Sequence, residues 1–313
     1  MNKEQLPFHL RSITILFALL LAVAALSTAA YAQESSAQGS SAQGSRISFN
    51  VQGSVDWIRG ELKAQAGYAL AQAGIRLPAG RTMAEEILLE AYPRLLRPYL
   101  LSLRVDSNAA TGDLLERGEF DLEELDSLIR DAEKTPPALS PDLAGMTGRY
   151  TVSMEKISAF LSRRSNAAEP PIPMIPVQTA DYTGIIIIAD TELPIHGRRA
   201  LALAEPCLFP KIWDTDMNLV YERNMMPAGQ AKLMVRYTVP ENIFRPTPSG
   251  LDGELAALVG PYPLRIIARE LFGISPTDPV IHREDALKIL SSENNRRLLR
   301  EGRVVLVLNE KML

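Results

Sequence analysis

The 313-residue sequence is poor in the side chains that bind metals and form covalent cross-links. It contains one cysteine, Cys207, and three histidines, His9, His196 and His282. A single thiol excludes an internal disulfide and any cysteine-rich zinc site. Because His9 lies in a segment that we expect to be removed on export, a site with three histidine ligands is excluded as well.

Sequence motifs for nucleotide binding and for serine hydrolases are absent too. There is no G-x-G-x-x-G, Walker A or G-x-S-x-G pattern. Two adjacent glutamate pairs, Glu85-Glu86 and Glu123-Glu124, lie in predicted helices, where neighbours point about 100° apart and cannot converge on one substrate atom. We therefore expect a protein that is not an enzyme and that holds no cofactor and no metal.

The N-terminus has the three parts of a secretory signal peptide over residues 1–32. These are the charged residues Lys3 and Arg11, an apolar run over 13–26, and the small triplet Ala30-Tyr31-Ala32. The run is shorter than the roughly 20 residues that span a bilayer, and no later run comes close. The residue after the cleavage site is Gln33 rather than cysteine, so no lipid anchor is expected there. The sequence predicts an exported, periplasmic protein without a transmembrane segment.

The charge balance is mildly acidic, with a formal net charge of −4. No basic block is present to neutralise phosphates. A nucleic-acid partner is therefore not expected.

Two shifts in composition divide the chain. Residues 33–46 contain a tandem SSAQG repeat and predict a flexible linker, and residues 166–180 contain four prolines and predict a semi-rigid connector. The structured parts are then an N-terminal half, residues 47–165, and a C-terminal half, residues 181–313.

Hydrophobic periodicity in the N-terminal half predicts strands and helices in alternation. A strand from Ile47, interrupted at Gly53, turns at Arg59-Gly60 into a second strand that ends near Tyr68. The later elements are a helix capped by Thr82 and Glu85 that kinks or ends early at Pro93 and Pro98, a helix over 121–134, and a strand over 148–154.

The C-terminal half opens with four isoleucines, Ile185–Ile188, which predict a buried central strand. The other predicted elements are a hairpin around 214–217, a helix over 251–259, strands over 264–271 and 304–308, and one helix over 284–300 that Gly302 terminates. Strands outnumber helices without a βαβ rhythm. The prediction is an α+β fold with mixed or antiparallel sheets and flanking helices.

Polar loops supply two candidate sites. Asp214, Asp216 and Asn218 match the first ligand positions of a calcium loop, but Leu219 and Met225 break the pattern, and a hairpin turn is the favoured interpretation. His196, Arg198 and Arg199 lie around a glycine after a buried strand. They are either a site for a phosphate or carboxylate or an exposed loop with local ion pairs.

Two further features have structural interpretations. Three arginines, Arg296, Arg297 and Arg300, suit the C-terminus of a helix, with a partner-binding patch as the alternative. Cys207, between Pro206 and Leu208, is expected to be a small buried apolar residue, with an intermolecular disulfide as the alternative.

Scattered motifs resemble one family of exported bacterial envelope proteins, the flagellar-P-like group, which is related to the twenty-kilodalton outer-membrane lipoproteins. The motifs are Ala84 with Leu88–Tyr92, Val105-Asp106-Ser107, Tyr182–Asp190, Phe209–Asp214, Pro276–Ile281, Glu284-Asp285-Ala286 and Gly302–Val305. The chain departs from the family in two places. It has no lipobox cysteine, and Thr191–Pro194 followed by the His196–Arg199 cluster stands where relatives are glycine-rich.

The resemblance implies a non-enzymatic structural or assembly protein of the cell envelope, in some members a component of rings around the flagellar motor. Self-association or envelope protein partners follow from it. The alternative function is a periplasmic small-ligand or glycan-binding module that uses the 196–199 loop.

Overall fold

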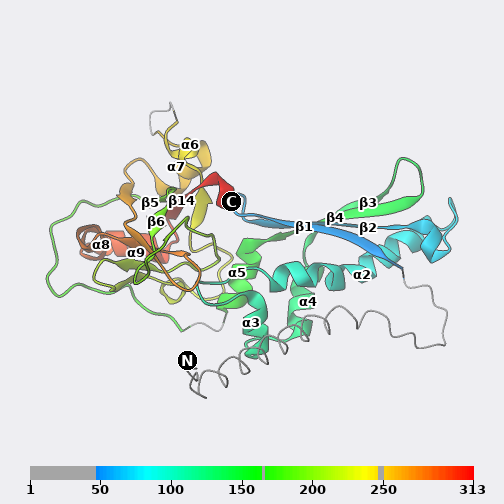
Figure 1. Ribbon diagram of the computed structural model, residues 1–313, viewed down its shortest axis with the longest axis horizontal. Coiled ribbons are helices and arrows are strands. Elements are labelled where there is room, and N and C mark those ends of the chain that lie inside the picture. Colours follow the sequence, from blue (N-terminus) through cyan, green and yellow to red (C-terminus); the bar gives the residue numbers. More distant parts are fainter. Residues whose placement is uncertain (1–46, 164–165, 246–249) are drawn as a thin grey trace, which may run out of the picture. The chain divides into compact units, whose positions relative to one another are not determined.

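The computed structural model describes residues 47–163, 166–245 and 250–313, which form the predicted α+β fold (Figure 1). The expected signal peptide, 1–32, and linker, 33–46, lie outside the described residues. Within these described ranges, no helix has the length and apolar character needed to cross a membrane.

The N-terminal half is built on one antiparallel sheet with the strand order β1-β2-β4-β3. Its strands are β1 (Phe49–Asp56), β2 (Glu61–Ala69), β3 (Glu133–Leu139) and β4 (Gly145–Ser153). The predicted turn is confirmed, because Gly60 has a φ of 66° and the N–H of Arg59 donates to Asp56 Oδ1 at 2.9 Å. The expected interruption at Gly53 is wrong: β1 runs through it, and the absent Cβ leaves room for the ring of Tyr99.

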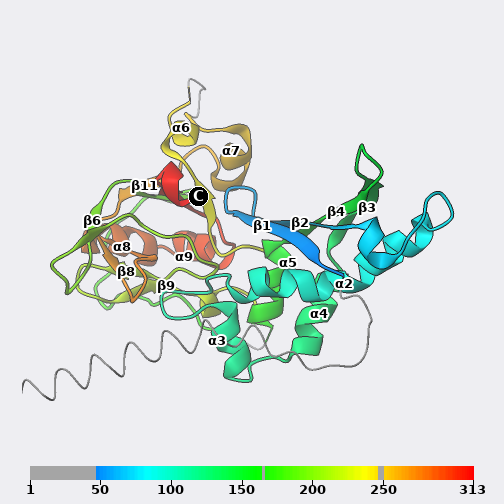
Figure 2. The same ribbon diagram turned by 45° about the vertical axis from the view of Figure 1, so that its right-hand side comes forward.

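Helices cover one side of this sheet (Figures 1 and 2). They are α2 (Arg81–Leu101), α3 (Thr111–Glu116), α4 (Leu122–Arg130) and α5 (Met154–Ser162), with a short 3-10 turn, η1 (Leu70–Ala73), after β2. The longest, α2, packs against β1, β2 and β4.

The predicted start of α2 is wrong. The helix begins at Arg81 after Gly80, which has no capping side chain, and Thr82 lies inside the first turn. Pro93 and Pro98 are inside the helix and do not end it. The buried stripe of α2 explains this, because its packing outweighs the hydrogen bonds that the prolines remove; the stripe is Ala84, Leu88, Tyr92, Leu96 and Leu100.

The predicted helix over 121–134 is shorter than expected. Asp121 caps it, because its Oδ1 accepts the N–H of Glu124 at 2.8 Å. Oε2 of Glu124 in turn accepts the N–H of Asp121. The helix ends at Arg130, and Lys134 belongs to β3. Pro136 and Pro137 favour this outcome, because proline is tolerated in an edge strand but not in a helix interior.

The C-terminal half contains three small sheets. A parallel sheet has the order β10-β14-β5-β11, a mixed sheet has the order β12-β13-β8-β9, and β6 and β7 form a hairpin. The strands are β5 (Ile185–Ala189), β6 (Leu193–Pro194), β7 (Leu201–Ala202), β8 (Ile212–Asp214), β9 (Leu219–Tyr221), β10 (Arg236–Thr238), β11 (Leu264–Ile267), β12 (Glu270–Phe272), β13 (Asp278–Ile281) and β14 (Val304–Leu308). The predicted central strand is confirmed, since β5 lies between β14 and β11 and is nearly all buried.

The helices of this half are α6 (Pro240–Ile243), α7 (Gly253–Val259), α8 (Arg283–Leu290) and α9 (Glu293–Arg300), with 3-10 turns η2 (Arg223–Met225) and η3 (Glu310–Met312). The prediction of a single helix over 284–300 is wrong, because Ser291 and Ser292 are not helical and separate α8 from α9. Gly302, with a φ of 66°, follows α9 as predicted.

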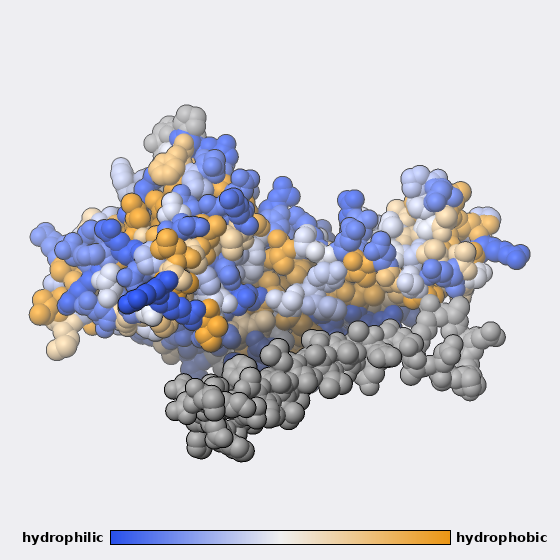
Figure 3. Space-filling model, in the orientation of Figure 1, coloured by the Kyte–Doolittle hydropathy of each residue, from blue (hydrophilic) through white to orange (hydrophobic). Residues whose placement is uncertain are grey.

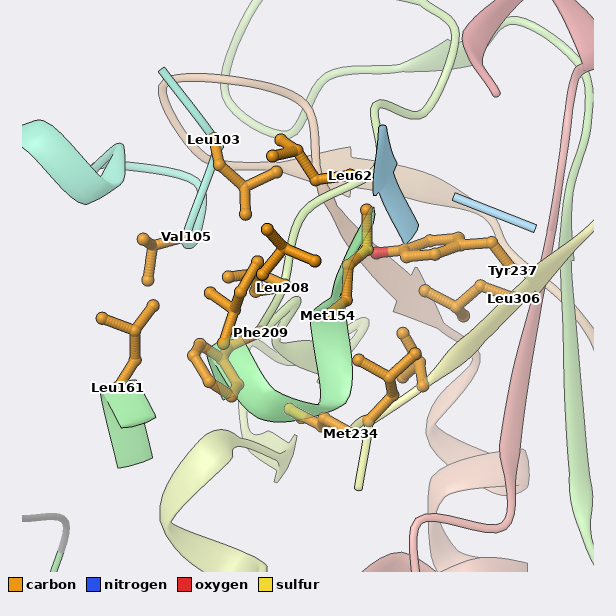
Figure 4. Close-up of a cluster of buried hydrophobic side chains, with 14 of the residues drawn as sticks. Leu62, Leu103, Val105, Met154, Leu161, Leu208, Phe209, Met234, Tyr237 and Leu306 are labelled. Atoms are coloured by element: carbon orange, nitrogen blue, oxygen red, sulfur yellow. The ribbon is translucent and has the colours of Figure 1, made fainter. Parts of the chain in front are cut away.

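Among the residues that the structure describes, the two halves share no sheet but share one hydrophobic core. Side chains from both halves meet in it (Figure 4): Leu62, Leu103, Val105, Met154, Leu161, Leu208, Phe209, Met234, Tyr237 and Leu306. Backbone bonds reinforce the contact, because the N–H groups of Leu208 and Phe209 donate to the carbonyls of Arg104 and Val105 at 3.0 and 2.8 Å.

The proline-rich connector has no helix or strand between residues 166 and 180. Its C-terminal end is fixed by Asn295, which is almost completely buried. The amide of Asn295 donates to the carbonyls of Ala180 and Lys288 at 2.9 and 3.0 Å and accepts the N–H of Tyr182 at 3.0 Å. One side chain therefore ties the connector to the break between α8 and α9.

Replacing Asn295 with alanine removes the hydrogen-bond partner of partly buried backbone groups of Ala180, Tyr182 and Lys288. We expect Asn295→Ala to lower the free energy of unfolding by about 1–3 kcal/mol, measured by urea denaturation. The matched control is Asn108→Ala, at an exposed asparagine, with an expected change within about 0.5 kcal/mol. Equal effects of the two substitutions would show that Asn295 does not fix the connector.

Candidate functional site

The 196–199 loop is the turn of the hairpin formed by β6 and β7. Gly197 has a φ of 74° at its tip, a conformation that glycine adopts without steric cost. The N–H of Arg198 donates to the carbonyl of Ile195 at 2.9 Å, and the N–H of Ile195 donates to the carbonyl of Ala200 at 3.0 Å. The loop is therefore a closed turn whose backbone bonds are largely internal.

His196 is held through its backbone and its ring. Its N–H donates to the carbonyl of Leu271 in β12 at 2.7 Å, and its Nδ1 lies 2.7 Å from Oε2 of Glu270. Both side chains are partly exposed, so the pair contributes only about 0–1 kcal/mol. The contact with Glu270 orients the imidazole through Nδ1.

The two arginines of the loop point into solvent. Arg198 Nη1 donates to the carbonyl of Ile274 at 3.4 Å, and Arg199 makes no hydrogen bond or ion pair with any of the described residues. In the described part of the chain, no hydrogen bond joins either guanidinium group to the ring of His196. The three candidate residues thus lie on one turn without forming a closed site, and their ligand role remains a hypothesis.

The Asp214 loop is the hairpin turn that the sequence favoured. It joins β8 to β9, and Met217 takes a φ of 60° within it. Asp214 Oδ1 accepts the N–H groups of Asp216 and Asn218 at 2.9 and 2.7 Å, and Oδ2 accepts the amide of Asn218 at 2.9 Å. The carboxylate is therefore engaged by its own turn. Over the described ranges, no group of three or more His, Cys, Asp or Glu side chains is placed to hold a metal ion.

The arginines of α9 are paired within the chain. Arg296 donates to the carbonyl of Leu290 and pairs with Glu293, and Arg300 pairs with Glu293 and with Glu169 of the connector. Arg297 is bonded to the side chain of Asn294 at 2.6 Å. These contacts favour a structural role over the partner-binding alternative.

Cys207 is fully buried, as the sequence predicted. Its N–H donates to the hydroxyl of Tyr237 at 3.0 Å, and that hydroxyl donates to the carbonyl of Cys207 at 2.8 Å. Burial raises the pKa of the thiol well above its usual range. A protonated, inaccessible thiol is unreactive.

The sequence analysis did not predict a buried carboxylate that lies at the contact between the halves. Asp278 is only 1% exposed. Its Oδ1 accepts the hydroxyl of Thr277 at 2.8 Å and the N–H of Lys211 at 3.1 Å, whereas no hydrogen bond of normal geometry from the described residues reaches Oδ2. An Asp before a proline in a turn-rich segment is an ordinary loop pattern, so the sequence carried no signal of this burial.

Gly273 explains how the N-terminal half approaches this carboxylate. It has a φ of 112°, and a Cβ at its position would lie 2.3 Å from the Cβ of Ser107. The N–H of Ser275 then donates to the carbonyl of Ser107 at 3.0 Å. The loop around Ser107 therefore packs against the segment that carries Asp278.

Comparisons with known proteins match both halves of the chain. Residues 48–160 match the family model described as the N-terminal domain of Treponema pallidum Tp0624, and residues 184–310 match the model described as its second domain. Together the matches cover more than half of the chain. No curated protein matches it.

The buried carboxylate gives a stability that depends on pH. Burial raises the pKa of Asp278 above its ordinary value, against hydrogen bonds from Thr277 and Lys211 that lower it. The folded protein therefore holds this proton more tightly than the unfolded chain. The stability that the protonated Asp278 contributes is therefore fully present at a pH below its pKa in the unfolded chain. It is lost as the pH rises through its higher pKa in the folded protein.

We expect Asp278→Asn to remove this dependence. Urea denaturation over a pH series should show the variant gaining stability relative to the original protein as the pH rises from acid to neutral. A constant difference between the two proteins across the series would contradict the assignment.

Proposed function

The chain belongs to the two-domain family of Treponema pallidum Tp0624, and we propose that it is a non-enzymatic structural or assembly protein of the bacterial cell envelope. It works in the periplasm by contacting itself or other envelope proteins. The expected signal peptide and the resemblance to the flagellar-P-like group support this location, and an association with the flagellar motor is part of the proposal.

The observation that carries the proposal is the exposed apolar surface of the connector. Ile172, Met174 and Ile175 are 72%, 100% and 82% exposed, and Val177 beside them is exposed as well. Single exposed apolar side chains are normal on a protein surface. Four of them within six consecutive residues concentrate exposed apolar surface on one short segment, the apolar patch, and such concentrations mark interaction sites.

This patch is presented from a fixed segment. On one side Pro170 is buried and Glu169 pairs with Arg300. On the other side the N–H of Val177 donates to Ser291 Oγ at 3.0 Å. A segment that is already ordered loses less conformational entropy when it binds.

The chemistry of the patch favours a protein partner. Residues 170–180 contain no charged side chain, whereas attachment to an anionic membrane surface uses clusters of lysine and arginine. Proline-rich apolar segments are typically bound in aromatic-lined grooves of proteins. The 196–199 loop offers no comparable feature, so we do not favour the small-ligand alternative.

A matched pair of double variants tests the proposal. Met174→Gln with Ile175→Gln changes the patch, and Met83→Gln with Leu89→Gln changes two exposed apolar residues of α2. After the mature N-terminus is confirmed as Gln33, cross-linking in cells and mass spectrometry identify the partners. We expect a cross-link to a second copy or to an envelope protein that falls at least tenfold in the connector variant and persists in the α2 variant. Equal cross-linking in both variants, or a monomer without partners, would contradict the proposal.

A further inference from the structure

The face of the N-terminal sheet that the helices leave open carries polar side chains in rows. Strand register places Gln52 opposite Gln65, Gln65 opposite Arg149, and Arg149 opposite Thr135. The rows on either side run through Asn50, Gly67 and Thr147 and through Ser54, Lys63 and Thr151. The opposite face carries the apolar side chains that pack on α2, such as Leu62, Tyr68 and Met146.

This open face is hollowed. One hollow of about 710 Å³ lies beside Asn50 and Gly67, and another of about 600 Å³ lies beside Lys63 and Thr151. Gln52 and Gln65 line both hollows, which therefore lie side by side on the open face. In Figure 3, hydrophilic side chains rise from the side of these strands that faces away from the helices. Each volume falls within the range of about 300–1,000 Å³ typical of ligand sites.

The charges on this face are nearly balanced. Lys63 Nζ pairs with Asp56 at 3.0 Å and with Glu61 at 2.9 Å. Arg149 Nε donates to Gln65 Oε1 at 3.4 Å. In the row formed by Gln52, Gln65, Arg149 and Thr135, Arg149 is then the one cation. A polyanion such as nucleic acid is bound through many basic side chains, so this face does not suit one.

An apolar partner is equally unsuited to the face. Among the described residues, none of the large exposed apolar side chains belongs to β1, β2, β3 or β4. What the face offers is side-chain amide and hydroxyl groups. A carboxamide donates through its NH₂ and accepts through its oxygen, which matches the N–H and C=O of an acetamido group, and threonine and serine match sugar hydroxyls.

We propose that the open face of this sheet binds an N-acetylated glycan chain. Gln52 and Gln65 contact the acetamido groups from the centre of the face, with Asn50, Thr147 and Thr151 on either side. Arg149 accommodates a carboxylate substituent where the chain carries one. From Asn50 to Ser54 the face extends about 14 Å along β1, so it fits an oligosaccharide rather than a single sugar. The site is separate from the connector and does not rest on the proposed function.

The test is calorimetric titration of the exported full chain with fully N-acetylated chitotetraose. We expect saturable binding that weakens at least tenfold in the double variant Gln52→Ala with Gln65→Ala. The matched control, Gln178→Ala with Gln230→Ala, removes two exposed glutamines outside the sheet and should bind as the original protein does. Unchanged thermal unfolding of all three proteins shows that the fold is intact.

Two further probes define the ligand. Maltotetraose lacks acetamido groups and should bind at least tenfold more weakly. Co-sedimentation with purified cell-wall sacculi, lost in the Gln52 and Gln65 variant, would identify the wall glycan as the source; binding of chitotetraose without sacculi would identify an N-acetylated polysaccharide outside the wall. No saturable binding of chitotetraose, equal affinity in both double variants, or equal binding of maltotetraose would overturn the proposal.

Discussion

The contact between the two halves joins residues 47–163 to the C-terminal half through one shared hydrophobic core. Residues 103–107 leave the end of α2 and pack into the C-terminal half, where two backbone bonds join Arg104 and Val105 to Leu208 and Phe209. Apolar side chains from both halves close over this contact in one core. Because burial of apolar surface is the main stabilising contribution to folding, each half is stabilised by the other. The open sheet face and the connector are consequently held in fixed positions on one folded unit.

Much of the fold could be predicted because local sequence and tertiary structure agree there. Four isoleucines specified the buried strand β5, and Arg59-Gly60 specified the turn between β1 and β2. The predictions that were wrong concern segments whose local structure depends on residues far away in the sequence. The break between α8 and α9 depends on Asn295, whose amide bonds to Ala180 and Tyr182, more than 110 residues away. The prolines of α2 are tolerated because its buried stripe packs on the sheet, and nothing in the local sequence records that packing.

The surfaces that matter for function were only partly visible in the sequence. The local sequence predicted the strands β1 and β2 and the turn between them. The order of the strands in the sheet places β4 next to β2 and Arg149 opposite Gln65. A single sequence does not reveal that order. The four prolines indicated a connector, but its exposed apolar side chains are a property of how its ends are fixed. The composition of the 196–199 loop indicated a possible anion site, whereas its geometry is that of an ordinary turn.

The shared core makes one prediction that separates this account from a pair of independent domains. The chain has two tryptophans, Trp57 in the N-terminal half and Trp213 in the C-terminal half. Trp57→Phe leaves the fluorescence probe Trp213 in the C-terminal half, and Trp213→Phe leaves Trp57, whose ring also packs against Tyr237 of the C-terminal half with 5.6 Å between the ring centroids. Equilibrium urea denaturation of the two variants, together with circular dichroism of each, should give coincident transitions at one midpoint. Two separate transitions, one for each tryptophan, would show that the halves unfold independently and would contradict the account.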